Sequence, residues 1–171
     1  ARYFPEVVWF AEKPLLRTAP TPLYLLSKHV RENERKVVLT GEGSDEVFGG
    51  YNIFRENKVR RFWAKNPDSE FRHLLLGRLY PYIFKDKRLA GMLKSFFGKG
   101  LTDTGDPLYS HLIRWGTASR TRHLFADHIR ETTTGYDAIE ALRGMLPEGF
   151  DRRDSFAKAQ YLEMAIFLSN Y

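Results

Sequence analysis

Four glycines and three carboxylates fall within residues 41–50, and this segment constrains the chain more than any other part of its sequence. It follows the apolar residues Val37, Val38 and Leu39. Because this stretch is apolar without alternation, we expect a strand over about residues 36–40 that is buried on both faces, as in a parallel sheet. Glycine lets backbone amides approach a ligand closely, so the following loop suits a small charged ligand better than a packed core.

The expected order of strand, glycine-rich loop and helix indicates what such a loop binds. Ligands of open α/β sheets bind beyond the carboxyl ends of the strands, and amides at a helix start favour phosphates. We expect Ser44 to cap a short helix with Asp45 and Glu46 in its first turn, ended by Gly49 and Gly50. Carboxylates beside phosphate require Mg²⁺ between them, which favours a magnesium–nucleotide site. The alternative is a glycine-rich turn whose acids only complement the helix dipole.

The rest of the chain carries dense helix signals and no second convincing strand. We expect about eight such helices, with Thr21, Asp86, Thr134 and Asp154 or Ser155 among the caps. Beyond the short helix at Ser44, they cover residues 22–33, 51–65, 68–80, 86–97, 107–115, 122–129, 136–145 and 155–170. One strand among helices predicts either a truncated α/β domain or a strand that pairs with another chain. The unpaired strand and the apolar last helix favour a homodimer.

The composition excludes several classes of site. The chain has no cysteine, which excludes a disulfide framework, a thiolate metal site and a cysteine nucleophile within it. The five histidines are scattered, so we interpret them as surface or hydrogen-bonded side chains. No Walker phosphate loop, dinucleotide fingerprint or calcium loop is present. No apolar run approaches the roughly 18–20 residues of a membrane span, and no signal pattern opens the sequence, so we expect a cytoplasmic protein without a membrane partner.

The net charge of +6 is unevenly distributed. Residues 51–100 hold twelve lysines and arginines against four acids, a balance of +8. Amphipathic helices with solvated basic faces are the preferred interpretation. The alternative is a helical module that binds nucleic acid through this stretch, and a third hypothesis is an interaction domain without chemistry.

The motif also resembles that of a known family. The run Thr-Gly-Glu-Gly-Ser-Asp-Glu-Val-Phe-Gly-Gly-Tyr at residues 40–51 resembles the Ser-Gly-Glu-Gly-Ser-Asp-Glu-Leu-Phe-Gly-Gly-Tyr motif of glutamine-dependent asparagine synthetases. Thr40 replaces the usual serine and keeps the hydroxyl. Residues 17–27 resemble the segment that precedes this motif in the family. The resemblance is specific over the motif, whereas the helical remainder matches in character more than in residues.

This resemblance implies a fold and a reaction. Residues 1–171 would be a single fragment of the synthetase domain, a mainly helical part of a truncated α/β domain of the adenine nucleotide alpha hydrolase type. The family adenylates the aspartate side-chain carboxylate with ATP and amidates it with ammonia from a glutaminase domain of the same polypeptide. The pyrophosphate loop and the glutaminase cysteine are not in this sequence. We therefore expect the fragment alone to be inactive and to bind ATP weakly.

The same resemblance implies roles for individual residues. Gly41, Gly43 and Ser44 would bind the nucleotide, and Asp45 would hold Mg²⁺ on the pyrophosphate. Glu42 would act as the base towards ammonia. Glu46 would be a supporting or capping residue, and Arg17 would orient the loop or anchor a helix by a salt bridge. A related synthetase that acts on another acceptor, or closes a β-lactam ring, is the alternative within the family.

Overall fold

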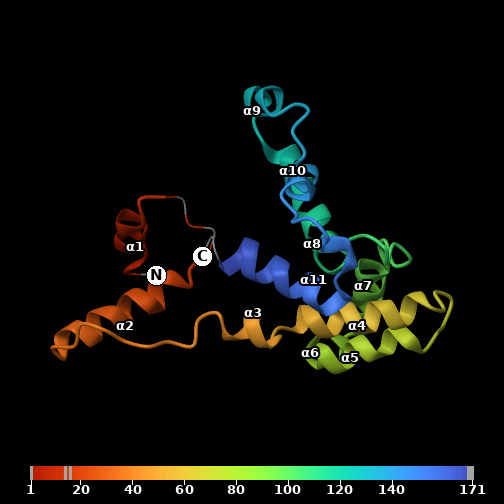
Figure 1. Cartoon of the computed structure of the whole chain (residues 1–171), viewed down its shortest axis with the longest axis horizontal. Helices are drawn as coiled ribbons and strands as arrows, with labels where there is room; N and C mark the ends of the chain where they lie inside the picture. Colours follow the sequence, from red (N-terminus) through yellow and green to blue (C-terminus); the bar gives the residue numbers. More distant parts are fainter. Residues whose placement is uncertain (1, 14, 16, 169–171) are drawn as a thin grey trace. The chain divides into compact units, whose positions relative to one another are not determined.

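The computed structural model describes residues 2–13, 15 and 17–168, and all regular structure within them is helical (Figure 1). The chain divides into two compact units, Ala1–Glu42 and Gly43–Tyr171. The elements are α1 (Phe4–Ala11), α2 (Pro20–Glu32), α3 (Ser44–Phe48), α4 (Asn52–Ala64), η1 (Arg72–Leu75), α5 (Leu76–Leu79), α6 (Pro81–Phe84), α7 (Lys87–Gly98), α8 (Tyr109–Ala118), η2 (Ser119–Leu124), α9 (Asp127–Thr132), α10 (Ala138–Gly144), η3 (Phe150–Arg152), α11 (Ser155–Leu162) and η4 (Glu163–Phe167). The mainly helical class expected from the sequence is thereby confirmed.

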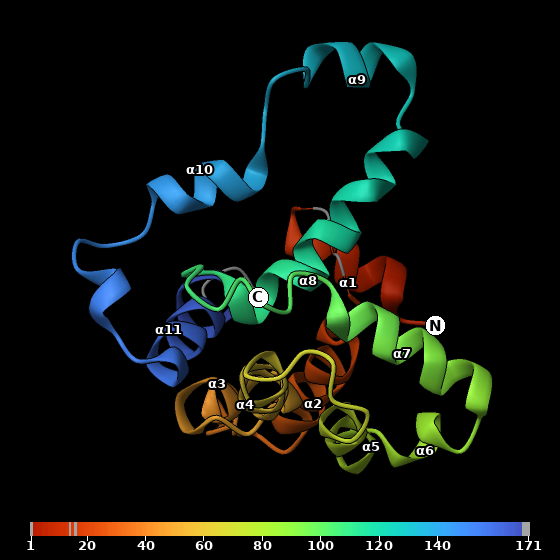
Figure 2. The ribbon, with the colours of Figure 1, turned by 90° about the vertical axis from the view of Figure 1, so that its right-hand side faces the viewer.

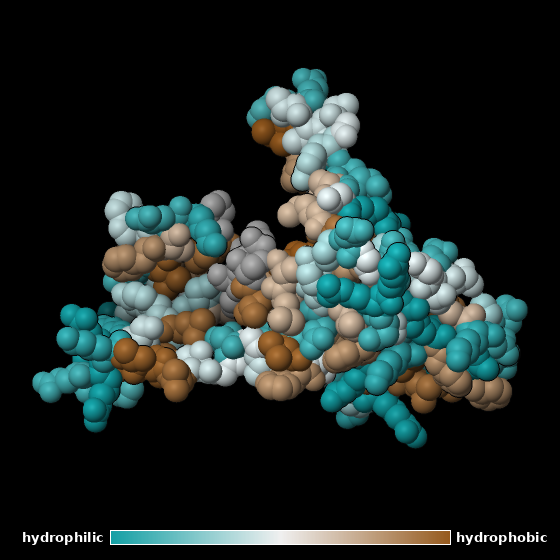
Figure 3. Space-filling model, in the orientation of Figure 1, coloured by the Kyte–Doolittle hydropathy of each residue, from teal (hydrophilic) through white to brown (hydrophobic). Residues whose placement is uncertain are grey.

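The expected strand at residues 36–40 is not formed, and no described residue belongs to a strand. The segment is irregular, and Val37 and Leu39 are 79% and 94% exposed. The prediction of a buried strand is wrong for this structure because a strand requires a neighbour to complete its backbone hydrogen bonds, and no described segment pairs with this one. The apolar residues therefore lie on the surface, where Figure 3 shows a hydrophobic patch after α2. Homodimer formation stays a prediction.

The first unit is a pair of packed helices. Val7 of α1 is buried, and Tyr24 of α2 packs against the rings of Tyr3 and Phe10 at centroid distances of 6.4 and 6.1 Å. Helix α1 is absent from the sequence-based expectations. Helix α2 starts at Pro20 with Ala19 as its cap residue, so the expected cap at Thr21 is wrong.

The second unit is organised around α4. Helices α5, α8 and α11 contact it, and Figure 2 shows α4 and α5 side by side while α9 lies far from them. Three apolar clusters form the core, the largest of which contains Trp63, Leu76, Phe97, Leu101 and Ile113. The second contains Ile53, Phe54 and Ala159 with Phe156, and the third contains Leu108, Phe150 and Leu162. The position of α4 therefore determines where the flanking helices lie.

The expected helix starts agree with the structure where an aspartate supplies the cap. Asp86 accepts a hydrogen bond from the amide of Arg88, and Asp154 accepts bonds from the amides of Phe156 and Ala157. Thr134 is not a cap, since Asp137 starts α10 instead. The last helix begins as expected but becomes a π-helical turn in η4, and its predicted end at Asn170 lies outside the described residues. No helix in the described part of the chain has the length and apolar character to cross a membrane.

An ion pair between Asp106 and Arg143 gives the second unit a pH-dependent contribution to stability. Two guanidinium nitrogens donate to the two carboxylate oxygens at 3.1 and 2.6 Å. Burial alone would raise the pKa of Asp106, but the hydrogen bonds from Arg143 and from the amide of Leu108 outweigh it and lower the pKa below its ordinary value. This stabilisation is present above the unfolded-state pKa and is lost as the pH falls through the folded-state pKa.

We therefore expect Asp106→Asn to lower the unfolding free energy at pH 7 and to flatten its dependence on pH below about 4. Urea titrations of both proteins between pH 7 and pH 2.5 measure this. Asp68→Asn, at an exposed position of the same unit, is the control and should leave the pH profile unchanged. Parallel profiles for the wild type and Asp106→Asn would contradict the assignment.

Candidate functional site

The glycine-rich motif forms a short helix with a left-handed glycine at each end. Gly43 precedes α3 with φ of 84°, and Gly49 follows it with φ of 72°. Few other residues adopt these angles without strain, so the two glycines fix where the five-residue helix begins and ends. Gly49 thus ends the helix as predicted. Ser44 is the first helical residue and makes no side-chain cap, so the expected capping role of Ser44 is wrong.

The structure places the five predicted site residues on two different units. Gly41 and Glu42 are exposed in the irregular end of the first unit, whereas Gly43, Ser44 and Asp45 open the second unit at the start of α3. Ser44 and Asp45 are exposed, and Gly43 is half-buried. The roles proposed for these residues stay predictions. Their side chains are open to solvent at Glu42, Ser44 and Asp45, as a role in binding requires.

The Asp45 carboxylate is held against a second glycine. The Gly50 amide donates to the Asp45 carbonyl at 2.9 Å, and the Asp45 Oδ1 atom lies so close to Gly50 that an added Cβ there would sit 1.9 Å from it. A side chain at position 50 would therefore force the Asp45 carboxylate to move. The last glycine of the motif thereby leaves the room that the Asp45 carboxylate occupies.

Glu46, the neighbouring acid, has a different environment. Its side chain is buried, and its Oε1 atom accepts a hydrogen bond of 2.9 Å from the Tyr51 hydroxyl. Burial, and then the Glu46 carboxylate, raise the pKa of Tyr51 to about 12. Glu46 Oε2 is buried without a partner among the described atoms. The two acids are thus separated in role: Asp45 faces solvent, and Glu46 supports the fold of the motif.

A buried polar network behind the motif was not expected from the sequence. Glu56 is 1% exposed and accepts hydrogen bonds from the Tyr80 hydroxyl and from Arg114 Nη2, the latter at 2.6 Å. Glu163 and His111 form a second buried pair at 3.0 Å. The partners are 24 to 58 residues apart in sequence, and no periodicity connects them. The general expectation of a hydrogen-bonded histidine is confirmed at His111.

The acids of the motif differ in how well they would fit Mg²⁺ bound beside a nucleotide. Among the described residues, no group of three or more histidines, aspartates or glutamates is placed to enclose a metal ion. Mg²⁺ bound beside a nucleotide commonly takes one or two protein carboxylates, with phosphate oxygens and water completing its shell. The exposed and oriented carboxylate of Asp45 fits this mode. The buried carboxylate of Glu46 does not.

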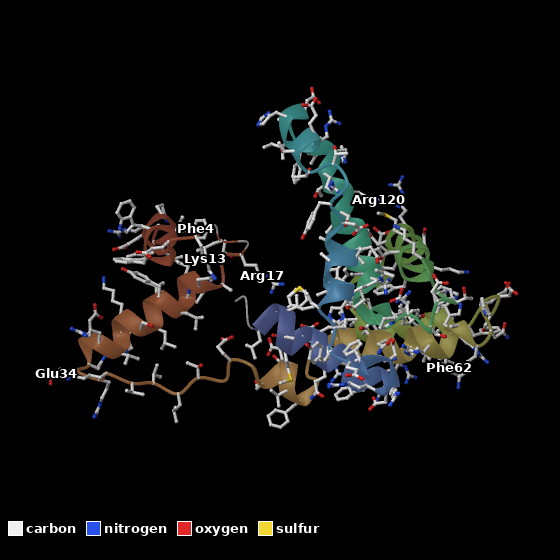
Figure 4. The ribbon with its side chains drawn as sticks, turned by 45° about the horizontal axis from the view of Figure 1, so that its top comes forward. Phe4, Lys13, Arg17, Glu34, Phe62 and Arg120 are labelled. Carbon is white, nitrogen blue, oxygen red and sulfur yellow. The ribbon has the colours of Figure 1, made fainter. Side chains whose placement is uncertain are left out.

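Arg17 of the first unit and two surface hollows of the second unit lie outside the motif. Arg17 is exposed in the segment between α1 and α2, where Figure 4 labels it, and its role stays a prediction. Two hollows open on the second unit, one beside Arg60 and Tyr109 and one between Trp115 and Met145. No motif residue lines either of these two hollows.

We expect Gly49→Ala to destabilise the second unit by about 1–3 kcal/mol, because the new Cβ requires a strained φ and meets a ring. The added atom would lie 2.7 Å from Phe156 Cε2. Gly91→Ala is the matched control, since a Cβ at position 91 meets no atom within 4 Å in the interior of α7. The control should be stabilised by up to about 1 kcal/mol. Denaturant unfolding of both variants tests the pair, and equal midpoints would contradict the close packing at Gly49.

Comparisons with known proteins show the family of this chain. The family model described as asparagine synthase matches residues 1–171. A Mycobacterium bovis protein, named provisionally as a glutamine-hydrolysing asparagine synthetase, is 30% identical over 148 residues, which cover 70% of this chain and 22% of the relative. Asparagine synthetase 1 of Bacillus subtilis is 48% identical over 52 residues, covering 30% of this chain and 8% of the relative. Asparagine synthetase B of Escherichia coli is 55% identical over 38 residues, covering 22% and 7%.

The chain therefore spans about a fifth of the length of the Mycobacterium relative. No solved structure matches the chain. The family model covers the chain from end to end, and the motif that carries the resemblance lies in an exposed, glycine-bounded helix start. On this basis, the chain belongs to the asparagine synthase family.

Proposed function

We propose that this chain is part of the synthetase domain of an ATP-dependent amidotransferase that makes asparagine from aspartate. The match of the family model over residues 1–171 is the observation that carries the proposal. The intact motif with an exposed, oriented Asp45 supports it. Relatives in three bacteria bear the name of glutamine-hydrolysing asparagine synthetases.

The proposed reaction has two steps. A carboxylate oxygen of aspartate forms a bond to the α-phosphorus of ATP, and the bond to the leaving pyrophosphate breaks. Ammonia then attacks the acyl carbon, the carbon–oxygen bond to AMP breaks, and asparagine and AMP leave. The ammonia comes from glutamine in a glutaminase domain of the whole protein. The ligase class follows from this use of ATP.

Residues of the motif would serve these steps in distinct ways. Asp45 would hold Mg²⁺, which supplies positive charge to the pyrophosphate oxygens. The amides at Gly41, Gly43 and Ser44 would bind the nucleotide, as amides at a helix start favour anions. Glu42 would accept the proton that the attacking ammonia loses, which makes it the candidate catalytic residue. The amide donors and Asp45 act mainly through electrostatics, whereas Glu42 acts by proton transfer.

The proposal is tested on the whole protein that carries this chain. We expect pyrophosphate release that requires ATP, Mg²⁺ and aspartate together and that is accompanied by AMP and asparagine. Release that needs another acceptor instead of aspartate would place the protein with the related synthetases. No release with any carboxylate acceptor would contradict the proposed function. For the isolated 171-residue chain we expect no activity and no calorimetric ATP affinity in the micromolar range.

Three of the six arginines in residues 51–100 are engaged within the unit, which weakens the alternative module that would bind nucleic acid through this stretch. Arg60, Arg61 and Arg72 donate hydrogen bonds to backbone carbonyls within the unit. These cations therefore stabilise the fold. Binding to nucleic acid that falls steeply with salt, and is unaffected by Asp45→Asn, would favour the alternative.

A further inference from the structure

Helix α3 is too short to be stable alone. It has five residues, and an isolated helix of this length is strongly disfavoured because nucleation costs more than its few hydrogen bonds return. Asp45 lies in its first turn. What holds α3 in place therefore also determines where the Asp45 carboxylate lies.

The C-terminal helix α11 and its continuation contact α3 at three points. Phe156 covers Gly49 at one end of α3, with its ring 2.7 Å from the position a Cβ would take. Leu168 lies 3.2 Å from the corresponding position at Gly43, at the other end. Between these contacts, Gln160 Nε2 donates a hydrogen bond to the carbonyl of Val47.

Two of the three contacting side chains lie on one face of α11. Phe156 and Gln160 are four residues apart, a spacing that places side chains on one face of an α-helix. After Gln160 the helix widens into the π-helical turn η4, in which the extra residue per turn changes the direction of the side chains that follow. Phe156 is anchored in turn by the ring of Phe54 in α4 at 5.2 Å. The helix that contacts α3 is thereby itself fixed to the core.

We propose that Gln160 is a positioning residue that seats α3 on α11 and so places the Asp45 carboxylate for Mg²⁺. Of the three contacts, only that of Gln160 is a hydrogen bond, and it reaches a carbonyl in the last turn of α3. The four final carbonyls of a helix have no partner within the helix. A donor from another helix therefore satisfies one of them and fixes the position of the helix end. Position 160 lies well outside the motif, and nothing in the motif indicates its role. The inference concerning Mg²⁺ rests on the proposed function, whereas the seating of α3 does not.

The test uses Gln160→Met in the whole protein, because methionine keeps the length and bulk of the side chain but removes the donor. Lys158→Met is the matched control, two residues away on α11 and turned from the face that carries Gln160. The first readout is hydrogen–deuterium exchange of the amides of residues 43–50. The second is the Mg²⁺ concentration that gives half-maximal pyrophosphate release, with glutamine hydrolysis as a measure of intact folding.

We expect Gln160→Met to speed exchange in residues 43–50 and to raise the half-saturating Mg²⁺ concentration up to about tenfold, the effect of one hydrogen bond. Glutamine hydrolysis should not change, and Lys158→Met should match the wild type in every readout. Faster exchange in a protein that releases no pyrophosphate would retain the seating and overturn the proposed function. Unchanged exchange and unchanged Mg²⁺ dependence in an active protein would overturn the seating while the proposed function stands.

Discussion

Replacing Arg60 by methionine is expected to lower the free energy of unfolding by about 3–5 kcal/mol, the largest stability effect of any single change considered in this chain. The Arg60 side chain lies in the core of the second unit and is 1% exposed. Its guanidinium donates to the carbonyls of Phe97, Tyr109 and Lys99 at 3.0, 3.0 and 2.8 Å, and more weakly to that of Gly100 at 3.4 Å. Burial lowers the pKa of this group.

The cost arises mainly from the acceptors that would remain. Each buried carbonyl left without a donor costs about 1–3 kcal/mol, and residues 97–100 connect α7 to the loop before α8. Methionine fills much of the volume of the arginine side chain, so the loss of unfolding free energy arises from the missing hydrogen bonds rather than from a cavity. The unfolding free energy of Arg60→Lys should lie between those of the wild type and Arg60→Met, because an ammonium group lacks the planar fork that reaches several carbonyls at once.

Chemical denaturation followed by circular dichroism measures the difference. Arg55→Met in the same helix is the control, since the Arg55 guanidinium makes one exposed hydrogen bond, of 3.3 Å, to Asn52. A surface change of this kind should alter the unfolding free energy by no more than about 0.5 kcal/mol. If Arg60→Met and Arg55→Met unfold at the same denaturant concentration, the structural role of Arg60 is wrong.

The second large effect is expected on activity. In the whole protein, Asp45→Asn should reduce pyrophosphate release about 100-fold or more, because the amide keeps the shape of the side chain but loses the charge that is proposed to hold Mg²⁺. Glutamine hydrolysis should persist, since no residue proposed for it lies in this chain. The reduction should be partly relieved by raising the Mg²⁺ concentration.

Variants of two other acids of the motif, Glu46 and Glu42, serve as comparisons for Asp45→Asn. Glu46→Gln keeps an oxygen that can accept from Tyr51, so its effect should be less than about tenfold. Glu42→Gln should lower steady-state release about 100-fold or more, since a general base contributes factors of this size, yet it should retain a first turnover of adenylation. Full activity of Asp45→Asn and Glu42→Gln would show that the motif is structural. An equal loss in Asp45→Asn and Glu46→Gln would contradict the separate roles assigned to the two acids.

Much of the helical fold could be predicted because its signals are local. Aspartate caps at Asp86 and Asp154 and a left-handed glycine at Gly49 act over one helical turn, so they can be read without the rest of the structure. The motif identified the candidate site for the same reason, because its seven glycines and acids are consecutive or nearly so. Thr134 failed as a cap because a competing aspartate lies three residues later.

Other features depend on residues that meet only in three dimensions. In α4, Phe62 is 44% exposed while Glu56 and Arg60 are buried, the reverse of what their polarity alone indicates. A charged side chain enters a core where distant groups pair with it, as Arg114 pairs with Glu56 and four carbonyls from two segments accept from Arg60. Periodicity within one helix carries no information about such partners.

The candidate functional site likewise depends partly on local sequence and partly on tertiary contacts. Family, motif and candidate residues follow from the order of amino acids at positions 40–51, since glycines and acids in that order have a chemistry of their own. The tertiary structure alone separated solvent-facing Asp45 from buried Glu46, left residues 36–40 without the strand partner they need, and brought Gln160 onto the end of α3. Each of these outcomes depends on contacts with segments far away in the chain, whose energies no local pattern records.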